Sequence, residues 1–436
     1  MFTIDHDRVA VHEVHTCVLG SGAAGLNAAL QLKRHGIDDL LLLTEGLDKG
    51  TSINTGSDKQ TYYKLGLYGG EPDSPHKMAA TFFDGGSMHG DTALIEAALS
   101  ARAFYNLLEL GVPFPQDRFG QFPGYKTDHD PLQRATSIGP YTSRAMCRAL
   151  IAAIKRIGVP VRENRIAVKL PTLAGESDSA APRVAGVLCV DTHAPPDACL
   201  ELYLCENLVF AVGGPGGLYR ESVYPVPHTG GIGLALEIGA EARNLADSQY
   251  GLASTRFRWN VSGTYMQVLP RLVSTAADGA SDRREFLLRY FGTPEKTACA
   301  VFLKGYQWPF DVRKIDGSSL IDLAVFIETV EKHRRVFLDY RTNMTGLDVT
   351  VLPGEVRDYL EKSGALSGTP IERLAKMNMP AVELYREHGI DLAREPLEIA
   401  LCAQHNNGGL AVGPWWESTN IRHLFPAGEV AGTHGI

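Results

Sequence analysis

Three glycines and one carboxylate near the start of the chain have the types and spacing that bind phosphate and ribose. The glycines are Gly20, Gly22 and Gly25, and the carboxylate is Glu45, twenty residues after the last glycine. In such a turn the first glycine permits a tight bend, the second lets the backbone approach a pyrophosphate, and the third lets a helix pack closely on a strand. The positive helix end holds the phosphate charge, and the acid accepts hydrogen bonds from ribose hydroxyls.

The elements that must hold this turn are visible on both sides of it. An apolar strand, His15–Leu19, precedes it, and an amphipathic helix over Leu26–His35 follows, with a stop at Gly36. A second apolar strand, Leu40–Leu43, then leads to the acid. This context favours a dinucleotide site over a glycine-rich turn of some other α/β fold, which stays open as the alternative.

Length and composition describe a large, soluble, globular protein. The chain has 436 residues, 44% of them hydrophobic and 21% charged, which is enough for two or three domains. Its net charge is −8 and its basic residues are scattered, which argues against nucleic acid or an anionic membrane surface as a partner. No apolar run approaches the ~18 residues of a membrane span.

Cysteine usage and the start of the chain both predict a cytoplasmic protein. The seven cysteines are dispersed and form no C-x-x-C pair, so neither an iron–sulfur cluster nor a zinc site is indicated. Met1–Asp7 carries acids and no apolar core, unlike a secretory signal. The cluster Thr127–Asp130 could ligate a metal, but two acids and one histidine in a loop are more typical of turns and caps, so we expect no metal.

Two further stretches point to a bound cofactor. Gly50–Lys64 is rich in hydroxyls and amides, and we expect it to run along the ring edge of a cofactor unless it is an ordinary surface loop. Leu200–Cys205 and Leu208–Val212 are predicted as separate strands, the second ending in two glycines as a central parallel strand beneath a cofactor does. Because no second G-x-G-x-x-G is present, we expect one dinucleotide site and no separate NAD(P)H domain.

Taken together, the chain resembles the FAD-binding superfamily of fumarate reductase, succinate dehydrogenase flavoprotein and aspartate oxidase. The matching segments are Gly20–Gly25 with Glu45, Phe210–Gly214, Gln404–Gly409 and Pro426–Glu429, in the order of the family. The resemblance implies an α/β fold in which a Rossmann-like FAD-binding domain is interrupted by an α+β capping domain. FAD would lie extended over the sheet, and the substrate would lie between the flavin ring and the cap.

The domain limits and the FAD contacts follow from the same resemblance. We expect residues 1–249 to form the first part of the FAD-binding domain, residues 250–398 the cap, and residues 399–436 the return segment. The family continues beyond such a return segment into a further helix, so we expect this chain to be a fragment or to be completed by another chain. The residues expected to contact FAD are Gly20, Gly22, Ala23, Ala24, Gly25, Glu45, Gly46, Ser52, Thr55, Gly56, Ser57, Asp58, Ala167, Ala211, Val212, Gly213, Gly428 and Glu429.

The histidine that links FAD covalently in respiratory members falls near Ile53 or Asn54, so the resemblance implies non-covalent FAD. It also implies hydride transfer between flavin N5 and a carbon, with an arginine-centred proton donor in the cap. The catalytic candidates are Arg313, Arg341 and His405, although each arginine could form a structural ion pair and the histidine could belong to the core.

The chain lacks the His-Pro-Thr motif of the dicarboxylate enzymes where the cap begins, since Asp247–Ala253 contains no histidine. This predicts a small organic substrate, acidic or unsaturated, other than fumarate, succinate or aspartate. Tyr306 and Trp308 could line an apolar pocket for it or pack the cap core. Two other functions stay open: a flavin oxidase of the aspartate oxidase type, and a non-catalytic FAD-binding subunit that relays electrons. An electron-transfer protein or a quinone is the expected partner.

Overall fold

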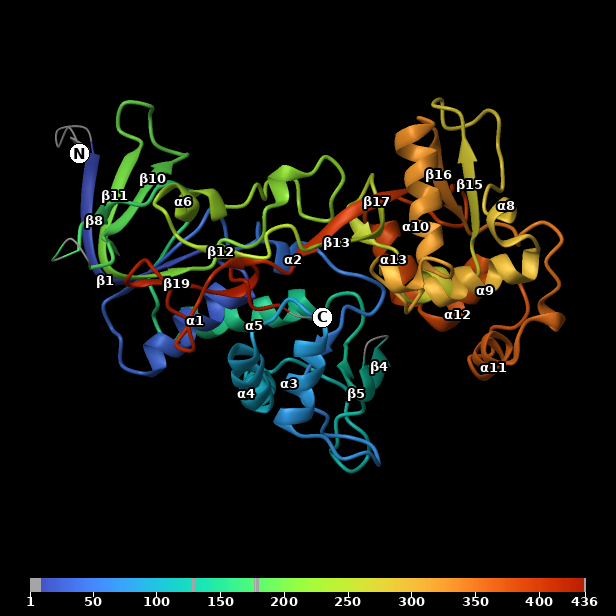
Figure 1. The fold of residues 1–436 in the computed structure, drawn as a ribbon, viewed down its shortest axis with the longest axis horizontal. Helices are drawn as coiled ribbons and strands as arrows, with labels where there is room; N and C mark the ends of the chain where they lie inside the picture. Colours follow the sequence, from blue (N-terminus) through green and yellow to red (C-terminus); the bar gives the residue numbers. More distant parts are fainter. Residues whose placement is uncertain (1–8, 128–129, 176, 178–179, 435–436) are drawn as a thin grey trace.

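The computed structural model describes residues 9–127, 130–175, 177 and 180–434, so Met1–Asp7 and two members of the Thr127–Asp130 cluster lie outside the described residues. Figure 1 shows three lobes: one around a large sheet, one formed by the middle of the chain, and a smaller one of helices and short strands. Among the described residues, no helix has the length and apolarity required to cross a bilayer.

A seven-stranded sheet carries the glycine turn. Five of its strands run parallel, and β10 and β7 extend it as an antiparallel edge. The two strands predicted over residues 200–212 are one continuous strand, because β1 pairs with β11 along its whole length, while β10 pairs with the first part of β11 and β19 with its last part. The strands are β6 (Val161–Arg162), β2 (Leu40–Leu43), β1 (Val9–Leu19), β11 (Leu200–Phe210), β10 (Gly186–Asp191), β7 (Arg165–Lys169) and β19 (Leu424–Pro426).

Side chains along β1 point alternately to the two faces of this sheet, and a different layer covers each face. Val18 faces a core shared with helices α1 (Ala23–Arg34) and α5 (Thr142–Arg156). Cys17 and Leu19 point the other way, into a core that includes α6 (Ile232–Glu237). Since both faces are covered, β1 and β2 are apolar where the layers enclose them.

The small lobe lies below the large sheet in Figure 1 and is made of helices and a three-stranded sheet. An ion pair is buried inside it, with Nη2 of Arg134 2.7 Å from Oδ1 of Asp73. Burial raises the pKa of the Asp73 carboxyl, but the hydrogen bonds and charge of this guanidinium, together with the amides of Gly66 and Ser74, outweigh burial and lower the pKa. The elements are β3 (Tyr62–Tyr63), α3 (Pro75–Asp84), α4 (Gly90–Glu109), β4 (Tyr125–Thr127) and β5 (Asp130–Thr136).

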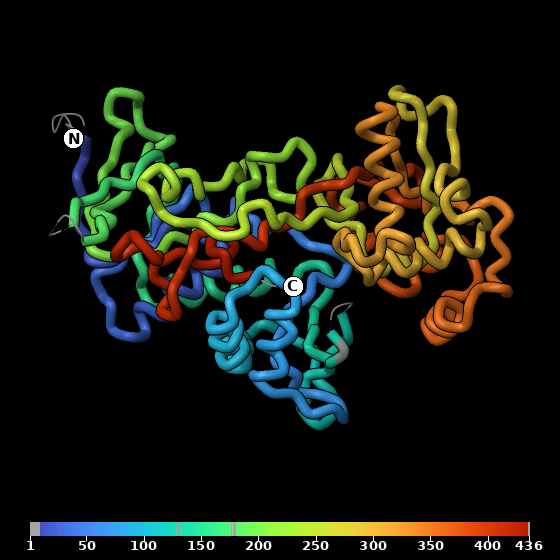
Figure 2. The backbone as a smooth tube through the Cα atoms, viewed as in Figure 1, coloured from blue at the N-terminus to red at the C-terminus, as the bar shows by residue number. Residues whose placement is uncertain are grey.

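The middle of the chain forms the lobe predicted as a cap. Its five-stranded sheet has the order β14-β13-β17-β16-β15. β13 and β17 form a long antiparallel ladder that runs between the cap and the large sheet, as Figure 2 also shows. The strands are β13 (Ser248–Ser254), β14 (Trp259–Asn260), β15 (Arg271–Thr275), β16 (Arg335–Asp339) and β17 (Leu397–Asn406).

Helices surround this second sheet and complete one large apolar core. They are α7 (Thr264–Gln267), α8 (Leu288–Phe291), α9 (Pro294–Lys304), α10 (Ser319–Phe326), α11 (Gly354–Lys362), α12 (Pro370–Met377) and α13 (Met379–Glu387). The remaining short elements are α2 (Thr51–Asn54), the antiparallel pair β8 (Thr172–Leu173) and β9 (Arg183–Val184), and the antiparallel pair β12 (Ala242–Arg243) and β18 (Gly409–Leu410). The return segment therefore starts inside the cap sheet, and the predicted limits at 249 and 398 stay predictions.

Candidate functional site

The glycine turn is fixed by close backbone packing. Gly20 has φ +104°, and a Cβ there would lie 2.3 Å from the carbonyl oxygen of Ala211. A Cβ on Gly25 would lie 2.0 Å from the carbonyl oxygen of Gly20. A Cβ on Gly22 would meet only Oγ of Ser52, at 3.4 Å. Two glycines are thus required by the protein itself, whereas the space at Gly22 is open to a ligand.

The first turn of α1 offers donors to an anion. Gly22 is the N-cap, and the amide of Ala23 donates to Oγ of Ser52 at 3.2 Å. The amides of Ala24 and Gly25 have no acceptor among the described residues. Free amides at the positive end of a helix form a site for a phosphate group, so these residues fit the pyrophosphate of a dinucleotide.

Glu45 follows β2 beside this turn. Its side chain has no hydrogen-bond or ion-pair partner within the described part of the chain, and its carbonyl oxygen accepts from the amide of Asn164 at 3.3 Å. The neighbouring amide of Arg165 donates to Thr44, so the start of β7, which contains Ala167, lies against the same edge. A free carboxylate here can accept from ribose hydroxyls.

We expect Glu45→Gln to weaken FAD binding about tenfold, because an amide accepts hydrogen bonds from ribose less strongly than a carboxylate by roughly 1.4 kcal/mol. Fluorescence titration of FAD against apoprotein measures the dissociation constant. Glu13→Gln is the matched control, since Glu13 is exposed on β1. Equal affinities for the two variants would contradict the assignment.

The second glycine turn lies against the first. A Cβ on Gly428, which has φ +74°, would lie 2.8 Å from Cβ of Ala24. The carboxylate of Glu429 accepts from the amides of Gly214 at 3.2 Å and Asn406 at 3.0 Å, and from the hydroxyl of Tyr224. Burial, and then the Glu429 charge, raise the pKa of the Tyr224 phenol.

Ala211 connects the two glycine turns to the large sheet, because its amide donates to the carbonyl of Leu19 at 2.9 Å. Val212 and Gly213 follow it. The structure therefore gathers the predicted residues Gly20–Gly25, 211–213 and 428–429 at the same ends of the parallel strands β1, β11 and β19.

The polar stretch after Glu45 links the large sheet to the cap. The stretch begins with helix α2, which contains Ser52. Just before the stretch, the amide of Gly46 donates a hydrogen bond to Oγ1 of Thr44. Oγ1 of Thr55 donates to the carbonyl of Val223 at 2.8 Å, and a Cβ on Gly56 would lie 2.6 Å from the Trp259 ring.

Asp58 is the main anchor of this stretch. Its buried carboxylate accepts from both the amide and the hydroxyl of Thr264, each at 2.7 Å. Burial raises the pKa of Asp58 against these bonds. Ser57 lies between the anchored residues and lines the cleft described below. The stretch Gly50–Lys64 therefore connects the large sheet to the cap, and we call it the seam.

His405 lies at the end of β17 in a cluster of polar side chains. Its Nδ1 lies 3.3 Å from Oδ1 of Asn407, and its Nε2 lies 3.9 Å from Oε1 of Glu429. The His434 ring stands edge-on to it at 4.8 Å. Burial, and then the proximity of His405, lower the pKa of His434 to about 3, so this ring is neutral at neutral pH.

Gln404 points to the opposite side of β17, and its amide donates to the carbonyl of Gly251 at 3.0 Å. Sequence reasoning missed His434, Tyr224 and Asn407 as members of the site. Asn407 and His405 lie in the segment Gln404–Gly409, which matched the family, and His434 lies shortly after the segment Pro426–Glu429. Their contact could not be predicted, because it depends on pairing between strands that are far apart in the sequence.

A cleft of about 930 Å³ opens between the seam and the cap. One wall is residues 55–61, and the opposite wall includes Trp308, the α9 residue Phe302 and the α11 residue Tyr359. Gln249 also lines it and donates to Oδ1 of Asn407 at 3.1 Å. This amide pair connects the cleft to His405.

The two candidate arginines do not join this cluster. Arg313 has a side chain that is 69% exposed and pairs with Asp311. Arg341 bonds to the buried Asp339, which also receives Arg271 and Arg283. Neither Arg313 nor Arg341 lines the cleft, and their catalytic roles stay predictions.

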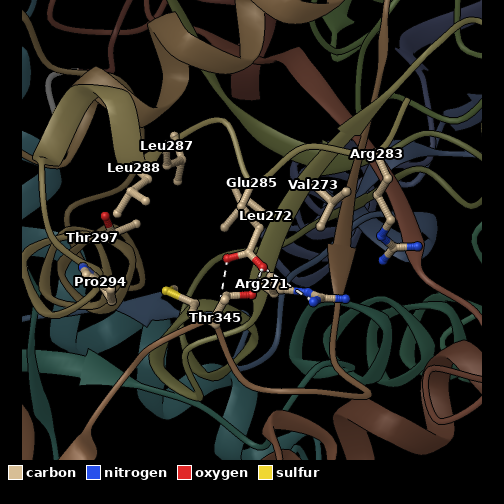
Figure 3. Close-up of a pocket in the computed structure, with 11 residues that line it drawn as sticks. Arg271, Leu272, Val273, Arg283, Glu285, Leu287, Leu288, Pro294, Thr297 and Thr345 are labelled. Carbon is tan, nitrogen blue, oxygen red and sulfur yellow. Dashed lines mark hydrogen bonds and ion pairs between the residues drawn. The ribbon is translucent and has the colours of Figure 1, made fainter. Parts of the chain in front are cut away.

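A second cavity, of about 400 Å³, lies within the cap near Arg271. Figure 3 shows Glu285 placed between Thr345 and Arg271, with Leu287, Leu288 and Pro294 on the far side. Oγ1 of Thr345 donates to this carboxylate at 2.7 Å and Nη1 of Arg271 lies 3.3 Å from it. The charges around this cavity are therefore already paired. Among the described residues, no group of three or more His, Cys, Asp or Glu side chains could hold a metal ion.

The parallel sheet, its glycine turns and the free helix amides define a dinucleotide-binding protein of the α/β class. The family model described as FAD binding domain matches residues 15–283, and the chain belongs to this family. The resemblance inferred from the motifs, the α/β fold class and FAD as the cofactor are thereby confirmed, and the chain is of the FAD-dependent oxidoreductase class.

Known proteins that the chain is similar to cover most of its length. It is 23% identical to a fumarate reductase (CoM/CoB) subunit of Methanothermobacter marburgensis, over 98% of this chain and 68% of that protein. It is 25% identical to L-aspartate oxidase of Mesorhizobium japonicum, over 96% and 69%. A mutant of the E. coli quinol fumarate reductase has a similar fold, with a TM-score of 0.68, 17% identity, and coverage of 98% of this chain and 66% of that one. The chain spans about two thirds of the length of these proteins.

Proposed function

We propose that this chain is the FAD-binding and capping part of an oxidoreductase that moves a hydride between flavin N5 and a carbon of a small organic substrate. The observation that carries the proposal is the cleft between the seam and the cap, whose wall residue Gln249 reaches the His405 cluster through Asn407. A substrate in this cleft lies beside the polar stretch that was predicted to run along the cofactor.

The residues divide into those that hold FAD and those that face the substrate. The α1 amides would hold the pyrophosphate, and Glu45 would hold the ribose. Gly428 lets the second glycine turn approach the first closely. When bound, FAD supplies the redox chemistry by accepting or giving a hydride. The cap closes the cleft and excludes water from it.

His405 is the proposed proton-handling group nearest the cleft. Asn407 orients the imidazole through Nδ1, and Nε2 lies 3.9 Å from the Glu429 carboxylate. Arg313 and Arg341 stay proposals for the proton donor. The substitutions His405→Gln, Arg313→Gln and Arg341→Gln separate the candidates, because loss of the donor lowers kcat without lowering FAD content.

We further propose that FAD is bound non-covalently, since α2 contains no histidine and the amide of Asn54 is engaged with the carbonyls of Asp48 and Gly50. Acid precipitation of the purified yellow protein is expected to release the flavin to the supernatant. Colour that stays in the pellet would contradict this attachment.

Substrate-dependent bleaching of the bound flavin under nitrogen tests the function itself. A panel of small organic acids and unsaturated compounds is expected to contain one that changes the flavin spectrum within a turnover time. If nothing in such a panel does so, the proposal falls in favour of a non-catalytic electron-relay subunit.

The oxidase alternative is favoured by the similarity to L-aspartate oxidases. Formation of hydrogen peroxide during aerobic turnover distinguishes it from a reductase or dehydrogenase. Without peroxide, the electron partner is proposed to be another protein or a quinone.

A further inference from the structure

The cleft between the seam and the cap has a wall that suits rings better than short acids. Six aromatic residues line it: Tyr63, Tyr125, Phe302, Tyr306, Trp308 and Tyr359. Phe302 stands edge-on to both Tyr306 and Tyr359, at 6.2 and 5.2 Å between ring centroids. Such a cluster offers flat apolar area and ring edges to a planar ligand.

The charges of the cleft do not suit a dicarboxylate. Among the described residues that line it, none is an arginine, the side chain that best forks onto a carboxylate. Its lysines, Lys59, Lys126 and Lys362, are matched in number by Asp58, Glu355 and Asp358. Lys126 and Lys362 are exposed, so they stand at the rim. Two carboxylates would enter this interior without a matching pair of cations.

The size and the free polar atoms agree with a larger, partly polar molecule. A volume of about 930 Å³ is near the top of the range for small-molecule sites, roughly 300–1,000 Å³, and exceeds the need of a four-carbon acid beside a flavin ring. Two lining residues keep a buried polar atom without a partner in the described structure: the Trp308 indole N–H and Oδ1 of Asn260. Both atoms are covered in this structure, and the indole nitrogen lies against Gly251, so a ligand with a carbonyl and a hydroxyl would satisfy them once the groups that cover them move aside.

We propose that the cleft takes a flat, ring-bearing organic molecule with one or two neutral or singly charged polar groups, in place of a short dicarboxylate. That this molecule is a substrate rests on the function proposed above. Its binding does not, because the aromatic residues line the cleft whether or not a hydride is transferred.

Two probes with a shared core test this inference. Fumarate and trans-cinnamate both contain a carbon–carbon double bond joined to a carboxylate, and they differ in carrying a second carboxylate or a phenyl ring. Isothermal titration of the FAD-loaded protein is expected to give a dissociation constant at least tenfold lower for cinnamate. Equal or tighter binding of fumarate, or binding of neither, would overturn the inference.

A matched pair of variants locates the ring. Trp308→Phe is expected to weaken cinnamate binding about threefold to tenfold, because it removes aromatic area from the cleft wall. Trp415→Phe is the control, since Trp415 is 89% exposed and outside the cleft. An unchanged affinity in Trp308→Phe would overturn the placement in the cleft. Failure of the proposed function is recognised separately, as cinnamate binding without any substrate-dependent change of the flavin spectrum.

Discussion

Gly22→Ala is expected to yield a folded protein that has lost most of its affinity for FAD. The backbone at Gly22 is extended, with φ −68°, so alanine adopts it without strain, and the new Cβ meets only Oγ of Ser52 at ordinary contact distance. The methyl group occupies the space that a phosphate would use. We expect a loss of about 100-fold, equivalent to two hydrogen bonds to a charged group at roughly 1.5 kcal/mol each.

Two other glycines separate this effect from damage to the fold. Gly20→Ala places a Cβ 2.3 Å from a backbone oxygen at φ +104°, so we expect a large fall in the melting temperature as well as loss of FAD. Gly36→Ala also has a positive φ, +87°, but meets nothing within 4 Å, and isolates the cost of the backbone conformation.

Thermal melting of the apoproteins and FAD titration are the two measurements. If Gly22→Ala bound FAD as tightly as the natural chain, the pyrophosphate would lie elsewhere and the assignment of the turn would be wrong. If it melted as early as Gly20→Ala, the effect would be structural.

The glycine turn could be predicted because its requirements are local. A strand, a tight bend and a helix N-terminus are all written within thirty residues of sequence, and each glycine answers to a neighbour in that unit or to the adjacent strand. The surroundings of His405 could not be predicted in this way. Its contacts with Glu429 and His434 depend on the ladder between β13 and β17 and on the return of the chain to β19.

The two arginines carry a sequence signal for the ion pairs that they form. Each follows an aspartate by two residues, as Asp311 precedes Arg313 and Asp339 precedes Arg341. Arg341 follows the end of β16, and in an extended segment side chains two residues apart lie on the same side, whereas Arg313 lies in a 3-10 turn whose N-cap is Asp311. Such a pair satisfies its own charge locally, which is what both arginines do in the structure.

The extent of β11 and the seam also needed tertiary information. Whether the strand continues past residues 205–207 depends on its pairing with β1, which persists while the other neighbour changes from β10 to β19, and the local sequence does not specify this pairing. The polar character of Gly50–Lys64 was evident, but the burial of Asp58 comes from Thr264, over two hundred residues later.

A buried ion pair in the cap gives the second large effect. Nζ of Lys304 lies 2.5 Å from Oδ2 of Asp322, and both side chains are fully buried. Lys304 ends α9, the helix that brings Phe302 to the cleft. Lys304→Met removes the cation and leaves the carboxylate alone in the core. We expect a loss of about 3–5 kcal/mol in the free energy of unfolding at pH 8.

This loss depends on pH with a defined sign. Burial raises the pKa of Asp322 to about 6, against the opposite effect of Lys304. A carboxyl whose folded pKa lies above its ordinary value of 3.8 favours folding fully below that value, and this contribution is lost as the pH rises through about 6. Without the lysine the pKa of Asp322 rises further, because the charge and the hydrogen bond of Lys304 both lower it.

Urea unfolding of Lys304→Met at pH 5 and pH 8 is therefore expected to show a much smaller loss at pH 5, where the carboxyl can be neutral. Lys155→Met, at an exposed position of α5, is expected to change stability little at either pH. The double variant Lys304→Met with Asp322→Asn removes both charges and is expected to recover most of the stability at pH 8. A loss that is equal at both pH values, or that persists in the double variant, would mean that packing of the lysine stem and not its charge holds this part of the cap. In that case side-chain packing alone, without the ion pair, would hold α9 and place Phe302 in the wall of the cleft.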